Sequence, residues 1–115
     1  MQCYRLPARA MLIASLTFNV RPDKRVEFVS AAEDILDRLR MRQGCLGCRL
    51  VSDHENDNVF VMTSEWDSLT FLERYIESDE FSVLEGTRIL LRDGPSLSID
   101  EVLSRRRTPR PKRSC

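Results

Sequence analysis

The segment Gly44–Trp66, GCLGCRLVSDHENDNVFVMTSEW, decides the fold. Two apolar stretches flank the polar turn DHENDN, a pattern that predicts a β-hairpin. The second arm carries Phe60 and Met62 on one face and Val59 and Val61 on the other. An antiparallel sheet with one face in water would not need apolar residues on both faces. We therefore expect one face to pack against helices and the other against a second subunit.

Cys45 and Cys48 form a C-x-x-C pair in the first arm, a spacing found in zinc and redox sites. Side chains alternate along a strand, so residues three apart face opposite sides of a sheet. This alternation predicts that the two thiols do not converge and serve only in packing. A zinc site would also need two further ligands, and the single histidine, His54, lies in the polar turn. The sequence therefore predicts no metal site.

Two regular patterns precede the hairpin. Leu12–Val20 alternates between apolar and polar residues, which predicts a strand with one strongly apolar face. A helix is predicted from Pro22 to Met41, because proline suits the first helical turn. The same helix carries an apolar stripe at steps of three and four residues, formed by Phe28, Val29, Ala32, Ile35, Leu36 and Leu39.

After the hairpin, Ser68 and Ser78 are expected to cap two helical segments, the second reaching about Leu91. A turn at residues 93–95 separates them from a last strand that includes Leu97. The resulting order is β-α-β-β-α-α-β. It predicts the α+β, ferredoxin-like class: a four-stranded antiparallel sheet with helices on one face.

The chain of 115 residues is long enough for one domain. We expect that domain at residues 11–103, a loose extension at 1–10 and a basic, disordered tail at 104–115. All 18 acidic residues lie within residues 11–104, so the body is acidic and nucleic acid is not an expected partner. No apolar run has the length of a membrane span. Small residues precede the first apolar run instead of following it, which argues against a signal peptide and predicts a cytoplasmic protein.

Several short pieces, in order, resemble the antibiotic biosynthesis monooxygenase (ABM) domain family. They are VRPDKR at 20–25 leading into EF, GCLG at 44–47, EW at 65–66 and SDEF at 78–81. The resemblance implies a homodimeric α+β barrel with a pocket between sheet and helices in each subunit. It also implies a monooxygenase that needs no metal, flavin or other cofactor. The substrates implied are O₂ and a small quinol-like or polycyclic phenolic compound.

The resemblance also implies candidate site residues. Trp66 occupies the family's tryptophan position at the end of the third strand. The aromatic polyketide oxygenases of this group carry an asparagine four residues earlier and a tyrosine six residues later, where this chain has Met62 and Leu72. Tyr75, one helical turn further on, is the substitute proton donor. We therefore expect Trp66 and Tyr75 as catalytic residues and Met62, Ser64 and Leu72 as substrate-binding residues.

The sequence is also consistent with other functions. Some relatives degrade haem with a histidine ligand, but this chain has Glu85 at the matching position, so haem is not expected. The main alternative is a dimeric, non-catalytic protein of the same fold that binds a small ligand or serves in stress. It is motivated by Met62 and Leu72, neither of which can transfer a proton. An isomerase acting on a small carbonyl or phosphorylated compound is a third possibility for this fold.

Overall fold

The computed structural model describes residues 11–103. The predicted extension at 1–10 and the predicted tail at 104–115 lie outside the described residues. The elements, in chain order, are β1 (Met11–Asn19), η2 (Pro22–Lys24), α1 (Arg25–Arg40), β2 (Cys45–Ser52), β3 (Val59–Trp66), α2 (Leu69–Ile76), α3 (Asp79–Ser82), η3 (Val83–Leu90) and β4 (Ser96–Val102).

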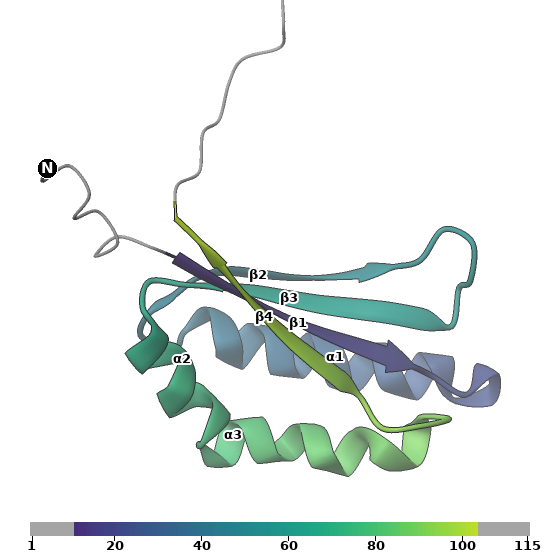
Figure 1. Ribbon diagram of the computed structural model, residues 1–115. Helices are drawn as coiled ribbons and strands as arrows, with labels where there is room; N and C mark the ends of the chain where they lie inside the picture. The colour runs from purple at the N-terminus through teal and green to yellow at the C-terminus, as the bar shows by residue number, and fades with distance from the viewer. Residues whose placement is uncertain (1–10, 104–115) are drawn as a thin grey trace, which may run out of the picture.

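The four strands form one sheet in the order β2-β3-β1-β4, and every neighbouring pair is antiparallel. All the helices lie on one face of this sheet (Figure 1). The predicted ferredoxin-like α+β fold is therefore confirmed, as is the hairpin at Gly44–Trp66. In the pairing of β1 with β3, Leu12 lies opposite Trp66, Ala14 opposite Ser64 and Leu16 opposite Met62.

The core lies between the sheet and α1, as predicted from the alternation in the strands and from the apolar stripe of the helix. Residues of β3 alternate strictly between buried and half-buried. One buried cluster centres on Phe18, Phe28 and Phe60. The ring centroid of Phe28 lies 5.0 Å from that of Phe18 and 5.1 Å from that of Phe60. A second buried cluster lies at the other end of the sheet and consists of Leu12, Ala14, Leu39, Trp66, Leu72 and Tyr75. This second cluster contains most of the predicted site.

Two serine caps fix the path of the chain after the hairpin. The Ser68 hydroxyl accepts a hydrogen bond from the Phe71 amide, and the Ser78 hydroxyl accepts one from the Phe81 amide. Each cap satisfies a backbone N–H that the first helical turn leaves without a partner. The predicted second helical segment is one short α-turn, α3, that continues as the 3-10 helix η3.

Gly44 connects the end of α1 to β2 in a conformation that requires glycine. Its φ is +89°, and a Cβ atom there would overlap the ring of Phe71. This close approach holds the start of β2 against α2.

The prediction that Cys45 and Cys48 face opposite sides of the sheet is wrong. The register between β2 and β3 shifts between Cys45 and Gly47, so one extra residue is inserted there as a β-bulge. Cys45 then lies opposite Trp66, and Cys48 lies opposite Ser64, both on the helix-covered face. An unbroken strand would place Leu46 on the same face as Cys48, but Leu46 is 57% exposed. Strict alternation fails here because the bulge adds one residue, which returns Cys48 to the same face of the sheet as Cys45.

The other face of the sheet is not covered by any segment of residues 11–103 (Figure 1). Ile13, Val59 and Val61 are half-buried there and Val51 is 43% exposed, alongside Arg49 and several hydroxyl residues. Within the described part of the chain, no helix is long and apolar enough to cross a membrane.

Candidate functional site

Four of the five predicted site residues line one small cavity between the sheet and the helices. We call it the inner cavity. Its walls are Ala14, Leu16, Leu39, Met62, Ser64, Leu72, Tyr75, Ile76, Phe81 and Leu97. Its volume is about 10 Å³, at the lower limit of what holds one water molecule. The structure thus brings Met62, Ser64, Leu72 and Tyr75 together, although side chains almost fill the space between them.

Trp66 lies behind this cavity and does not line it. Its side chain is fully buried, and its Nε1 donates a 2.8 Å hydrogen bond to the Ser64 hydroxyl. Its ring stacks on that of Tyr75 with centroids 5.3 Å apart. Trp66 therefore fixes the positions of the two polar side chains of the cavity, Ser64 and Tyr75.

Tyr75 is held between aromatic neighbours and is 5% exposed. Trp66 stacks on one side of its ring, and Phe81 meets it edge-on at 5.3 Å. Burial, with a smaller contribution from the Glu80 carboxylate, raises the pKa of Tyr75 to about 12. At neutral pH the phenol therefore keeps its proton, so it can donate a hydrogen bond but cannot act as a base.

A larger depression, the outer groove, opens on the other side of Tyr75. It measures about 260 Å³ and lies between α1 and the α2–η3 segment, lined by Ala31, Asp34, Ile35, Arg38, Leu39, Tyr75, Glu80 and Val83. Tyr75 and Leu39 line both the groove and the inner cavity. These two side chains are therefore the partition between the two spaces.

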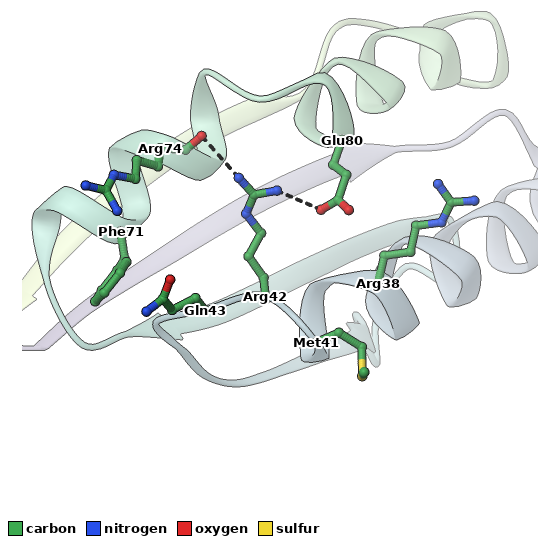
Figure 2. Close-up of a pocket in the computed structure, with 7 residues that line it drawn as sticks. All are labelled: Arg38, Met41, Arg42, Gln43, Phe71, Arg74 and Glu80. Atoms are coloured by element: carbon green, nitrogen blue, oxygen red, sulfur yellow. Dashed lines mark hydrogen bonds and ion pairs between the residues drawn. The ribbon is translucent and has the colours of Figure 1, made fainter.

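Cationic side chains surround one end of the groove. Arg38 and Glu80 are shared with an adjoining pocket of about 290 Å³, which Arg42 and Arg74 also line. In Figure 2, Arg42 reaches from the end of α1 toward the segment that carries Arg74 and Glu80. It donates a 3.0 Å hydrogen bond to Glu80 Oε1 and a 3.4 Å bond to the Arg74 carbonyl. Its guanidinium also lies 5.3 Å from the centre of the Tyr75 ring.

These residues give the site a definite chemistry. Three guanidinium groups and one carboxylate, Glu80, line the adjoining pocket, so it favours an anion. The groove beside it is mostly apolar and also carries the carboxylate of Asp34. A flat apolar molecule with one ionised oxygen would match this combination.

The sequence did not identify Asp34, Arg38, Arg42 or Glu80 as site residues. Arg42 and Glu80 are 38 positions apart, and their ion pair exists only because α3 folds back beside the end of α1. For Arg38 alone, the sequence holds a partial signal of its place in the site. It lies beside the apolar stripe of the helix, three residues after Ile35 and one before Leu39. Glu80 lies in the SDEF piece at 78–81, whose sequence does not show that this carboxylate meets Arg42.

Metal ligands are not gathered in the described part of the chain. Among residues 11–103, no group of three or more His, Cys, Asp or Glu side chains is placed to hold a metal ion. His54 is exposed in the hairpin turn, and Glu85 pairs with Arg88 at 2.7 Å on the surface.

A four-stranded antiparallel sheet, covered on one face by helices that enclose an apolar cavity, defines a class of small α+β proteins. A family model gives the particular family: residues 11–84 match that of the antibiotic biosynthesis monooxygenases. Since the match covers more than half of the chain, the protein belongs to this family.

Solved structures of low sequence identity share the fold. A conserved protein from Methanosarcina mazei superposes with a TM-score of 0.76 at 20% identity, covering 84% of this chain and 96% of its own. An antibiotic biosynthesis monooxygenase superposes with a TM-score of 0.71 at 16% identity, covering 77% and 95%. An uncharacterised protein from Synechocystis is 23% identical over 70 residues, 61% of this chain. The present chain spans about half the length of that relative, 48%.

Proposed function

We propose that the protein is a cofactor-independent monooxygenase that oxidises a small quinol-like or polycyclic phenolic substrate with O₂. The observation that carries the proposal is the position of Tyr75. Its ring separates an apolar groove beside three arginines from a much smaller cavity beneath the sheet. Family membership supports the same reaction class.

The arginines favour the ionised substrate. A phenol that enters the groove places its oxygen near Arg38 or Arg42, and a nearby guanidinium lowers the pKa of that oxygen. The carboxylates of Asp34 and Glu80 line the same groove and are the proton acceptors within reach. Tyr75, which stays protonated, then donates a hydrogen bond to the oxygen of the reacting substrate that gains negative charge.

The reaction needs no electrons from the protein. The substrate anion reduces O₂ directly, one oxygen atom enters the ring as a carbonyl oxygen, and the other leaves as water. The role of the protein is to hold the anion beside apolar walls and to exclude water from it. Ala31, Ile35 and Val83 supply such walls in the groove. Met62, Leu72 and Ser64 line the inner cavity on the other side of Tyr75, with Trp66 hydrogen-bonded to Ser64.

The proposal includes a homodimer. The open face of the sheet carries Ile13, Val51, Val59 and Val61, which a second sheet would bury. Light scattering at micromolar concentration should report twice the monomer mass. A monomer at that concentration would contradict the dimer, and charge placed on the face by Val61→Lys should dissociate it.

Oxygen uptake by the metal-free protein tests the reaction. With a panel of quinols and anthrones, we expect uptake above the uncatalysed rate. Loss of the hydrogen bond from Tyr75 in Tyr75→Phe should lower the rate by about 10- to 100-fold. Tyr4→Phe removes the protein's other tyrosine and is the matched control, expected to keep the full rate.

The second candidate is a protein that binds such a ligand without turnover. It is favoured by the inner cavity, whose only polar side chains, Ser64 and Tyr75, are weak proton acceptors. Thermal stabilisation by the same panel, with no oxygen uptake above the uncatalysed rate, would favour this candidate over the monooxygenase.

A further inference from the structure

The bulge in β2 gives the C-x-x-C pair a geometry that strand alternation does not allow. Cys45 and Cys48 both project from the helix-covered face, opposite Trp66 and Ser64. Both side chains pack against the buried cluster that contains Trp66 and Tyr75. They lie opposite residues two apart on β3, so they are neighbours on one face of β2, and each influences the pKa of the other. A disulfide between such neighbours requires Cα atoms within about 7 Å of each other.

Both thiols are reduced in the structure, and each donates a hydrogen bond to a backbone carbonyl. Cys45 Sγ donates to the Gly47 carbonyl at 3.5 Å, within the bulge itself. Cys48 Sγ donates to the Leu36 carbonyl of α1 at 3.7 Å. Both bonds are long and involve sulfur, so breaking them costs little.

A small oxidant has access to the pair from the side of α1. Both cysteines are half-buried and keep part of their surface in contact with solvent. An open depression of about 470 Å³ is lined by Glu33, Leu36, Asp37, Arg40, Arg49 and Leu50. It lies near Cys48, because Leu36 accepts the hydrogen bond of that thiol and Arg49 follows it in β2. Glu33 and Asp37 balance the two arginines in this lining, so the depression does not select for the charge of the thiol compound.

We propose that Cys45 and Cys48 form a reversible disulfide by exchange with a small-molecule disulfide such as glutathione disulfide. One thiolate attacks a sulfur of the oxidised compound and releases one thiol, and the second cysteine displaces the other. For glutathione disulfide, the protein loses two hydrogen atoms and two molecules of reduced glutathione form. The exchange balances without any further reactant, and it does not depend on the proposed oxygenase activity.

The electrostatics set how fast the exchange runs. Burial raises the pKa of both thiols, and Glu65 near Cys45 and Asp37 near Cys48 act in the same direction. Arg40 acts in the opposite direction on both. At neutral pH the pair is therefore largely neutral, and the exchange rate should keep rising with pH above the ordinary thiol pKa.

The disulfide would act directly on the candidate site. Its two half-cystines would lie opposite Trp66 and Ser64, the hydrogen-bonded pair behind the inner cavity. Trp66 is the only tryptophan in the chain, so its emission reports on this place alone.

The test uses the full chain with Cys3 and Cys115 replaced by serine, equilibrated in mixtures of reduced and oxidised glutathione. Mass spectrometry after acid quenching should show the loss of two hydrogen atoms in one transition, without lasting glutathione adducts. Emission from Trp66 should fall over the same transition and recover with excess reduced glutathione. Circular dichroism should show that the fold is kept.

Two single-cysteine variants and a urea-unfolded control distinguish the proposed disulfide from other products. Cys45→Ser and Cys48→Ser, each in the same background, should stop at one glutathione adduct and show no loss of two hydrogens. The protein unfolded in urea shows which mixtures oxidise an unconstrained C-x-x-C pair. Native protein that stays reduced in those mixtures, or that ends as a mixed disulfide, would overturn the proposal.

Discussion

The Tyr75 ring lines both the inner cavity and the outer groove. The residues around these two spaces differ in chemistry and in how far apart they lie in the sequence. Apolar side chains from neighbouring strands and α2 enclose the cavity, which is about 10 Å³ in volume. The groove is about 260 Å³ and is bordered by Asp34, Arg38 and Glu80 from elements that meet only in the folded chain. In the proposed reaction, the cavity supplies apolar packing behind Tyr75, and the groove supplies the charges that recognise the substrate.

The largest expected effect concerns the packing behind the cavity. Trp66→Ala removes a fully buried indole that contacts Ser64 and Tyr75, and should lower the free energy of unfolding by about 3–5 kcal/mol. Chemical denaturation measures this loss. Trp66→Phe keeps an aromatic ring beside Tyr75 and is expected to lose clearly less. Equal losses in both variants would mean that the Ser64 hydrogen bond matters more than the packed volume.

The next effect concerns the ionisation of Tyr75. In a Tyr4→Phe background, absorbance near the phenolate band should give one titration midpoint at about 12, above the ordinary value of 10.0. Because the folded state disfavours the phenolate, this contribution to stability is complete below pH 10 and is lost as pH rises through about 12. A midpoint near 10 in the folded protein would contradict the buried position of the ring.

The smallest effect on stability is expected in the groove. Arg42→Gln removes the ion pair with Glu80, whose side chains are 25% and 38% exposed, and should cost about 1 kcal/mol or less. Affinity for an ionised phenol should nevertheless fall by about tenfold, because one of the charges facing the ligand is lost. Isothermal titration calorimetry compares this variant with Arg40→Gln, which loses a similar surface pair with Asp37 away from the groove. Equal affinities in the two variants would remove Arg42 from the site.

The same comparison explains how far the sequence could be interpreted. Alternation and the capping serines predicted β3 and α2, whereas the choice of Met62, Ser64, Trp66 and Leu72 as site residues came from the family resemblance. Arg42 and Glu80 required knowing where α3 folds back, which is set by long-range packing that no local pattern encodes.

Cys45 and Cys48 show a different limit. The alternation rule was sound, but it assumes an unbroken ladder, and the inserted residue at Cys45–Gly47 breaks it. Glycine at position 47, inside a strand, was the available signal, since such a glycine often marks a bulge.

The most direct test of the proposed site follows the indole N–H resonance of Trp66. The chain has one tryptophan, so this signal is unique, and its hydrogen bond to Ser64 places it directly behind the cavity. In an anaerobic titration with a dihydroxynaphthalene, we predict that the resonance shifts and saturates, because a ligand in the groove contacts the Tyr75 ring that stacks on Trp66. Saturable shifts elsewhere, with the Trp66 signal unchanged, would contradict the location of the site.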